Sequence, residues 1–403
     1  MTIPRESDYC APNPDADFTG SEPPPSPPLP NLPFGCSRSF EWGNLIAMDR
    51  LDYPTAHAVS HTIAEHFRRE VKVAGIRADI PDAATIERII NAAFWASLRR
   101  EEGRPPTISL AYLPPAGSAL LVERPLPLDP VTLTKLAPAV ERPGVHLGVW
   151  NNGAGGGLAV WGATRLIPPL CFVLEVIEPG LLVIKHRRAD PDGKFANVAV
   201  LEGDQVKIVD AEGTLASECP DFVSTLLGFD PASGSADNVL LPLALSMRAH
   251  HHGGSLLVVP HGSDAWRKSI VSVPYQVAPP FSKLRDGASK DAIDAIGGLT
   301  AVDGAVILND RWDVLAFGAK LGRTESGPFV EQVLVREPIR GHTPVKVHAS
   351  ELGGTRHLSA AQFIHEQRDS LALVASQDGR FTVFGWSQRA RMVHAYRVEA
   401  LLL

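Results

Sequence analysis

Two short motifs in the last third of the chain contain residues that could bind and activate a nucleotide. Asp303-Gly304-Ala305 places a carboxylate before the apolar run Val306-Ile307-Leu308, at the start of an expected strand. A carboxylate in this position can hold a divalent cation. Gly353-Gly354-Thr355-Arg356-His357 places a glycine-threonine turn and a cationic pair at the start of an expected helix. The first turn of a helix has unpaired N–H groups and the positive end of the dipole, so it receives phosphate. Together the motifs predict a nucleoside triphosphate site.

The elements that must position these motifs alternate between helix and strand. Apolar periodicity predicts helices over 238–250, 290–296 and 358–366, and strands over 255–259, 305–308, 314–321, 371–375 and 381–386. Each motif then lies at the end of an element, where ligands collect in α/β folds. Residues 238–403 are therefore expected to form an α/β domain, a mixed sheet flanked by helices.

The preceding region is expected to be a separate α+β domain over residues 41–210. Val59, Ile63 and Phe67 recur every four positions and predict a helix over 55–70, and Asp82 is a plausible N-cap for a second helix. Short β-like runs follow over 107–112, 146–150, 158–161, 171–177, 181–185, 198–201 and 206–209. Glycine-containing turns between several of these runs suit antiparallel hairpins.

Two further segments carry no core of their own. Residues 1–40 contain the proline-rich run 23–30 and are expected to be a disordered tail, with recognition by a proline-binding module as the alternative. Residues 211–237 combine a short expected helix over 221–227 with a Ser/Gly/Asp-rich stretch. We therefore expect a linker between the two domains.

Composition excludes several classes of protein. A chain of 403 residues with 44% hydrophobic and 21% charged residues is typical of a soluble two-domain protein. The net charge of -7 does not favour nucleic-acid binding. The four cysteines have no metal-ligand spacing, no signal peptide is evident, and prolines and glutamates interrupt the most apolar stretch, 166–184. We expect a cytoplasmic protein without a membrane or nucleic-acid partner.

Three other residue groups have both a chemical and a structural interpretation. The glycine run 153–157 precedes an expected strand and not a helix, which favours a hairpin tip over a dinucleotide site. His57, His61 and Glu65 lie opposite the apolar face of their helix, so a solvated face is favoured over a regulatory metal. His250-His251-His252 ends an expected helix, where the dipole explains the histidines better than a metal cluster does.

Three ordered blocks carry a resemblance to a known family. Asp303 to Ile307, Gly354 to His357 and Asp369 to Ser376 resemble the diadenylate cyclase domain, over about residues 238–390. The segment His252 to Val259 is similar to the first core strand of that family. The α+β region before it resembles the sensor domain called DACNV, which precedes some of these cyclases.

The resemblance implies a reaction and its partners. Two ATP molecules would condense to cyclic di-AMP, with each 3′-hydroxyl attacking the α-phosphorus of the other ATP and releasing pyrophosphate. Two cyclase domains must then face each other, which implies a homodimer or higher oligomer. Mn²⁺ or Mg²⁺ and fixed donors would neutralise the transition-state charge. The N-terminal domain would bind an unknown small ligand and regulate the cyclase.

The resemblance also implies roles for individual residues. Asp303 would bind the metal and help activate the 3′-hydroxyl, with Asp378 as a second metal ligand, and Arg356 and His357 would act on the triphosphate in catalysis. The nucleotide would be bound by Gly304, Ala305, Gly354, Thr355, Arg356, His357 and Ser359.

The chain departs from the family pattern at three places. Leu358 stands where the family has a second arginine, and Ala301-Val302 replaces the usual Leu-His. The family's acidic pair after the Ser376 strand is here Gln377-Asp378, so one of its two carboxylates is missing. Lys320 or Arg323 can supply the missing charge. Two alternatives to an active cyclase therefore remain: a degenerate cyclase domain that binds a nucleotide and signals by conformation, and an active N-terminal domain on a dimerisation scaffold.

Overall fold

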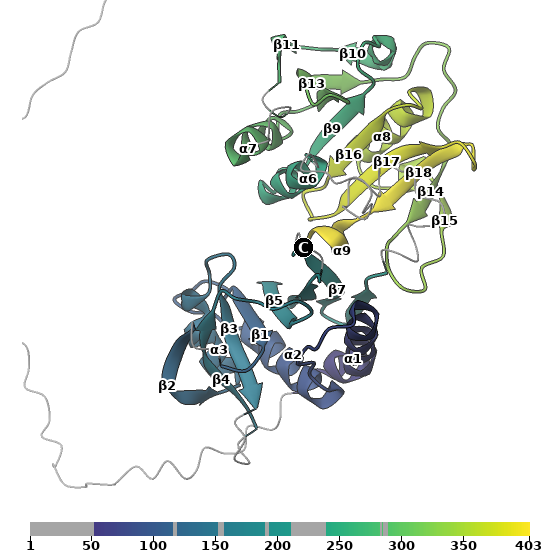
Figure 1. The fold of residues 1–403 in the computed structure, drawn as a ribbon. Coiled ribbons are helices and arrows are strands. Elements are labelled where there is room, and N and C mark those ends of the chain that lie inside the picture. The colour runs from purple at the N-terminus through teal and green to yellow at the C-terminus, as the bar shows by residue number, and fades with distance from the viewer. Residues whose placement is uncertain are drawn as a thin grey trace, which may run out of the picture. The chain divides into compact units, whose positions relative to one another are not determined.

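The computed structural model describes residues 52–115, 119–151, 157–189, 193–210, 239–282, 284 and 289–403. These residues contain two β-sheets, each with its own helices (Figure 1). The expected tail, the linker helix over 221–227 and most of the glycine run 153–157 lie outside the described residues.

The first sheet has eight strands in the order β2-β4-β3-β1-β5-β6-β7-β8. Strands β1 and β3 are parallel and the other neighbours are antiparallel. Their bounds are β1 (Ile108–Tyr112), β2 (Leu120–Pro127), β3 (His146–Asn151), β4 (Leu158–Thr164), β5 (Phe172–Glu178), β6 (Leu181–Arg187), β7 (Phe195–Glu202) and β8 (Gln205–Ile208).

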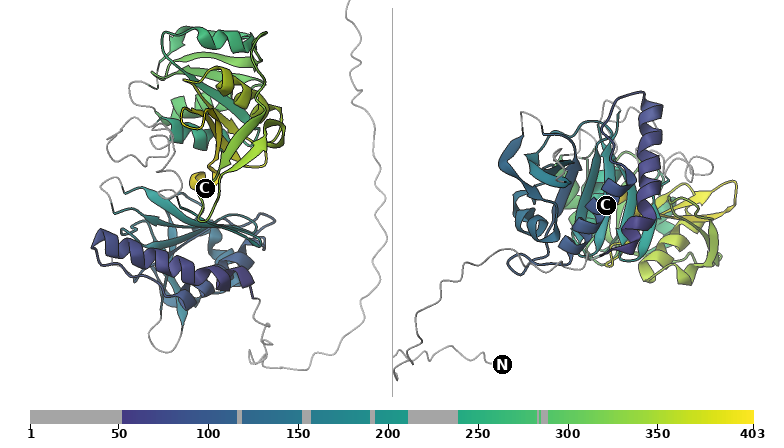
Figure 2. Two further views of the ribbon diagram at one scale, coloured as in Figure 1. Left: turned by 90° about the vertical axis from the view of Figure 1, so that its right-hand side faces the viewer. Right: turned by 90° about the horizontal axis from the view of Figure 1, so that it is seen from below.

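Helices α1 (Pro54–Ala74), α2 (Ala83–Ser97) and α3 (Pro130–Leu136) pack against this sheet, and α1 runs along one face (Figure 2). The predicted apolar stripe of α1 is buried, because Val59, Ile63 and Phe67 all join the core. Asp82 caps α2 as predicted, since its carboxylate accepts the Thr85 N–H at 2.8 Å.

Sequence patterns did not predict β2 and α3. Strand β2 lies at the sheet edge, is mostly exposed and contains two prolines, so it has no hydrophobic alternation to read. Helix α3 has seven residues, of which only Leu133 and Thr134 are buried. Elements with so little buried surface leave a weak sequence pattern.

The second sheet has ten strands. Nine follow the order β10-β13-β12-β9-β16-β17-β18-β14-β15, and β11 pairs with β13. Their bounds are β9 (Gly254–Val259), β10 (Ile270–Ser272), β11 (Tyr275–Phe281), β12 (Ala305–Asn309), β13 (Val314–Leu321), β14 (Gln332–Arg336), β15 (Val345–His348), β16 (Leu371–Ala375), β17 (Phe381–Ser387) and β18 (Met392–Arg397). The accompanying helices are α6 (Leu240–Ala249), α7 (Lys290–Leu299), α8 (Thr355–Glu366) and α9 (Glu399–Leu402).

The second sheet is the middle of three layers. In β9, Leu256 and Val258 pack with α6 and α7, whereas Leu257 and Val259 pack with α8 on the opposite face. Because both faces are covered, β9 is apolar at nearly every position. This arrangement confirms the predicted mixed α/β fold with a sheet flanked by helices. No described helix is long and apolar enough to cross a membrane.

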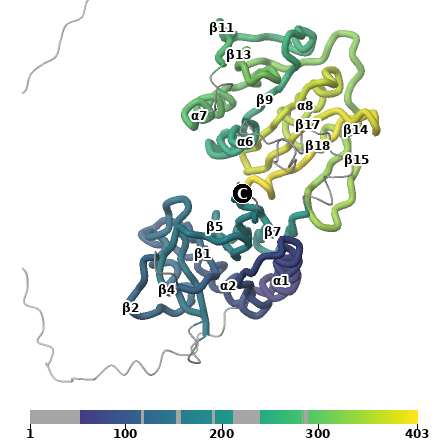
Figure 3. The backbone as a smooth tube through the Cα atoms, viewed as in Figure 1, coloured from purple at the N-terminus to yellow at the C-terminus, as the bar shows by residue number. Residues whose placement is uncertain are grey.

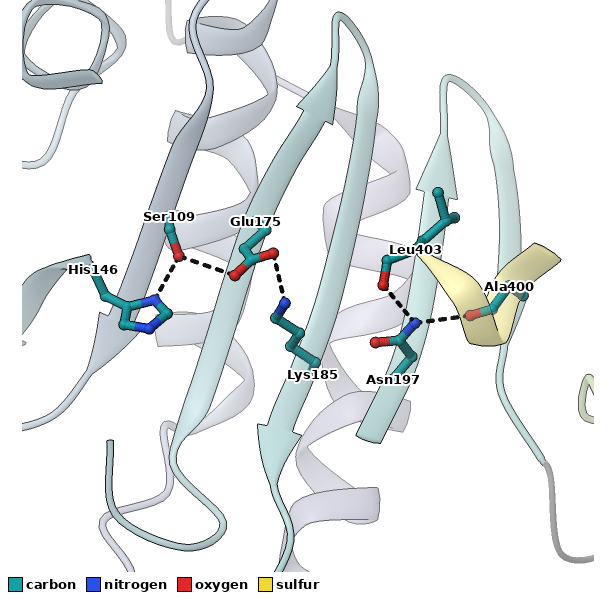
Figure 4. Close-up of polar contacts among 7 residues, drawn as sticks. All are labelled: Ser109, His146, Glu175, Lys185, Asn197, Ala400 and Leu403. Carbon is teal, nitrogen blue, oxygen red and sulfur yellow. Dashed lines mark hydrogen bonds and ion pairs between the residues drawn. The ribbon is translucent and has the colours of Figure 1, made fainter. Parts of the chain in front are cut away.

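The C-terminal helix α9 bonds to the first sheet. The Asn197 side chain donates to the Ala400 carbonyl at 3.0 Å and to the Leu403 carbonyl at 3.1 Å (Figure 4). The Lys207 ammonium also contacts the Glu399 carboxylate at 3.0 Å. Side chains of β7 and β8 therefore hold the end of the chain.

Candidate functional site

Strand register brings the two motifs to one end of the second sheet. Strands β9 and β12 run parallel, with Ala305 opposite Ser255. Strand β16 runs antiparallel to β9, so Ala375 at its end lies opposite Gly254 at the start of β9. The segment before β12, which contains Asp303, and the turn that follows β16 therefore meet at the same end of the sheet.

Arg356 of α8 reaches this end of the sheet. A Cβ atom built on Gly253 would lie 3.2 Å from Arg356 Nη1 and 3.4 Å from Gln377 Cγ. Arg356 is also close enough to Asp303 that its charge helps to lower the pKa of that carboxyl. The structure thus groups Asp303, Arg356 and Gln377 around the start of β9.

Asp303 is exposed and ion-paired. Its side chain is 89% exposed, and its Oδ2 lies 2.5 Å from the Lys320 ammonium, which also donates to the Asp303 carbonyl at 3.1 Å. The hydrogen bond and charge of Lys320 hold the pKa of Asp303 below its usual value. Of the two hairpin cations considered from sequence, Lys320 is thus the one at the motif.

Arg323, the other hairpin cation, is engaged elsewhere. Its guanidinium donates to the Gly327 carbonyl and stacks on the Phe329 ring at 4.0 Å. Leu358 on α8 is 40% exposed. Arg323 therefore does not stand in for the arginine that Leu358 replaces.

Gly304 is required by the packing of β12 on β13. Its φ of +120° disfavours residues with a side chain, and an added Cβ would lie 2.4 Å from the Gly318 carbonyl carbon. The glycine of this motif therefore has a structural function, separate from the predicted contact with the nucleotide.

His357 differs from the expected cationic partner of Arg356. Helix α8 begins at Thr355, three residues earlier than the helix start expected at Leu358, so His357 lies within the first turn. Its ring is 6% exposed, packs edge-on against Phe384, and places Nε2 3.4 Å from Thr382 Oγ1. Burial, followed by the charge of Arg397, lowers the pKa of His357. The ring is therefore neutral at neutral pH.

The start of α8 remains suited to an anion. Its N-cap is Gly354, which provides no side-chain cap, and Thr355 beside it is exposed. The first N–H groups thus have no side-chain oxygen as an acceptor. With Arg356 they make an electropositive surface, while Ser359 is half-buried further along the helix.

The carboxylates at this end of the sheet fit a hydrated divalent cation. Among the described residues no group of three or more His, Cys, Asp or Glu could hold a metal. Mg²⁺ commonly needs only one or two carboxylates, with water and substrate phosphates as its other ligands. Asp303 is an exposed carboxylate of this kind, although it is paired with Lys320 at 2.5 Å. Asp378 in the turn after β16 is likewise paired with a cation, Arg380, at 3.4 Å.

The histidine groups with a possible metal-binding interpretation do not form a metal site among the described residues. His57, His61 and Glu65 are exposed on α1, and His57 contacts Glu87 at 3.1 Å, as expected for a solvated face. His250 bonds to Thr300 at 3.0 Å at the end of α6.

One buried polar network in the first sheet escaped sequence reasoning (Figure 4). Ser109 Oγ lies 2.6 Å from His146 Nδ1 and 3.4 Å from Glu175 Oε1, and Lys185 contacts Glu175 at 2.6 Å. The serine stands between the histidine and the carboxylate, whereas a catalytic triad needs the histidine in the middle. We interpret the network as satisfied polar groups on the sheet face.

Comparisons with known proteins bear on the N-terminal part of the chain. Residues 76–165, which span α2 to β4, match the family described as "Probable sensor domain DACNV". This match confirms the resemblance to that sensor domain for these residues. No curated protein is similar enough to count as a relative.

Among solved structures, the chain is similar to DacA from Staphylococcus aureus, at 14% identity and a TM-score of 0.22. The similarity covers 41% of this chain and 83% of that chain. At this TM-score it carries no conclusion about function.

Proposed function

We propose that this protein is a diadenylate cyclase that joins two ATP molecules into cyclic di-AMP under the control of its N-terminal sensor region. The observation that carries the proposal is the convergence of Asp303, Arg356 and the uncapped start of α8 at one end of the second sheet. The DACNV match of residues 76–165 supports the sensor part.

The phosphates would be held by Arg356 and the first N–H groups of α8. Arg356 is the cation here, because burial keeps His357 neutral. His357 would instead fix the first turn of α8 against β17 through Phe384 and Thr382. Its role is therefore positioning, and Arg356 makes the charge-assisted contacts.

Asp303 would hold the divalent ion together with substrate phosphates. When bound, Mg²⁺ or Mn²⁺ supplies neutralisation of the charge on the reacting phosphate. The 3′-hydroxyl of one ATP would form a bond to the α-phosphorus of the other, its proton would be lost to a base, and pyrophosphate would leave. Because each site holds one ATP, two copies of the chain must face each other.

A second candidate function is a degenerate cyclase domain that binds a nucleotide without converting it. The exposed Leu358 and the Lys320–Asp303 ion pair favour this candidate. The first removes a phosphate-binding cation, and the second places a cation where a metal ion would bind.

A product assay on the full chain distinguishes the two. Purified protein is incubated with ATP and Mn²⁺ or Mg²⁺, and cyclic di-AMP is measured by mass spectrometry. We expect product from the wild type and from Asp264→Asn, a control in which the lost carboxylate is also exposed and paired with a cation, here Arg267. Asp303→Asn should lose it.

The other outcomes are equally clear. Full activity in Asp303→Asn would refute the assignment of Asp303. ATP binding without product under both metals would favour the degenerate domain, and binding of neither ATP nor cyclic di-AMP would refute both candidates.

A further inference from the structure

A pocket of about 320 Å³ lies between α1, the end of β8 and the segment after β14. Pockets of this size hold small molecules. Its polar lining comes from Thr62, Glu65, His66 and Arg69 of α1, together with Asp210 and Arg340. The pocket is separate from the candidate nucleotide site at the start of β12.

Backbone hydrogen bonds fix the wall that carries Arg340. The Arg340 N–H donates to the Ile208 carbonyl at 2.7 Å, and the Asp210 N–H donates to the Pro338 carbonyl at 2.9 Å. The segment after β14 of the second sheet is therefore paired with the end of β8 of the first sheet. Figure 3 traces the backbone through both parts of the chain. A ligand in this pocket would therefore contact the end of β8 in the first sheet and the segment after β14 in the second.

The lining presents charges of both signs. Arg69 and Arg340 contribute guanidinium groups, and Glu65 and Asp210 contribute carboxylates. Arg69 already lies 3.4 Å from the Glu70 carboxylate. Among the described residues, however, neither Arg340 nor Glu65 forms an ion pair through its side chain. A ligand with both an anionic and a cationic group would complement this lining better than a simple anion.

His66 contributes an uncharged ring to the lining. Arg69 Nη2 lies 3.3 Å from His66 Nδ1, and because arginine only donates, the ring proton must lie on Nε2. That buried Nε2 has no hydrogen-bond partner within the described part of the chain. Burial lowers the pKa of His66 to about 4, so the ring is neutral at neutral pH.

We infer that this pocket binds a small zwitterion of the amino-acid class, with its carboxylate near Arg340 and Arg69 and its ammonium group near Glu65. The inference rests on the proposed function and deepens it, because it names the class of ligand that the sensor region would bind. The pocket is also lined by Arg340, which lies between β14 and β15 of the second sheet. A bound ligand would link α1 to the segment that contains Arg340. This link would couple ligand binding to the second sheet.

Isothermal titration calorimetry of the full chain with the proteinogenic L-amino acids tests the inference. Each amino acid is compared with two analogues, the carboxylic acid that lacks the amino group and the amine that lacks the carboxylate. We expect binding of at least one amino acid, and affinities lower by about tenfold or more for both of its analogues.

Substitutions place the binding in this pocket. Arg340→Gln and Glu65→Gln should each lower the affinity for the amino acid by about tenfold or more. Arg142→Gln and Glu123→Gln remove the same charges from exposed positions outside the pocket and should leave the affinity unchanged. Circular dichroism of each variant confirms that the fold is retained.

Three results would overturn the inference. They are binding of no amino acid, equal binding of the analogue without an amino group, and binding that neither Arg340→Gln nor Glu65→Gln weakens. Because calorimetry follows the ligand and not cyclic di-AMP, failure here is distinguishable from an inactive cyclase domain.

Discussion

Replacing Gly304 with alanine should destabilise the second sheet without touching any charged group of the candidate site. The added Cβ would lie 2.4 Å from the carbonyl carbon and 2.5 Å from the carbonyl oxygen of Gly318. Both are backbone atoms of β13, so they cannot move aside as a flexible side chain could. The φ of +120° adds backbone strain of its own.

These two effects set the expected magnitude. Holding a non-glycine residue at an unfavourable positive φ costs roughly 1–3 kcal/mol. Forcing a methyl group into a packed region costs about 1–3 kcal/mol more. We therefore expect Gly304→Ala to lower the free energy of unfolding by about 2–6 kcal/mol, and the melting temperature by about 5 °C or more.

Two other glycines separate strain from overlap. Gly75 has a φ of +65° with nothing within 4 Å of an added Cβ, so Gly75→Ala should show the cost of strain alone. Gly298 in α7 has neither a positive φ nor a close neighbour, so Gly298→Ala should stabilise by about 0.5–1 kcal/mol. Differential scanning calorimetry resolves these changes even if the two sheets unfold in separate steps. A Gly304→Ala protein as stable as Gly75→Ala would refute the reasoning.

Two further predictions concern titration and metal binding. His394 is fully buried, and burial lowers its pKa from 6.5 to about 4, so its contribution to stability is complete above pH 6.5. About 3 kcal/mol should be lost as the pH falls from 6.5 to 4, and His394→Gln should flatten the pH profile in urea unfolding; an unchanged profile would contradict this. Lys320→Gln should tighten Mn²⁺ binding at Asp303 by a few-fold at low salt, because it removes a cation from the carboxylate. Paramagnetic resonance titration measures this against Arg323→Gln as the control, and equal affinity in the two variants would contradict it.

Many regular elements with a buried apolar stripe were predictable, although β18, with four buried residues, was not. Val59, Ile63 and Phe67 identify α1 because a helix brings every fourth residue to one face. The apolar run that begins at Ser255 identifies β9 because both faces of that strand are covered. Strand β2, which buries little, left no such pattern.

The candidate site was predictable only in part. Asp303 and Arg356 stand out because few residue types bind cations or phosphates. The neutral state of His357 could not be predicted, because it depends on burial against Phe384, and Phe384 belongs to a distant strand.

The order of residues along the chain predicted the fold class, many of the helices and strands with strong periodicity, and the residue types able to bind a metal ion and a triphosphate. These follow from local chemistry and from spacing along the chain. The pairing of Lys320 with Asp303, and the place of Arg340 in a pocket with residues of α1, became visible in the folded structure. The physical reason is that ionisation, ion pairing and pocket shape depend on distances between residues far apart in sequence, and these distances are set by strand register and packing.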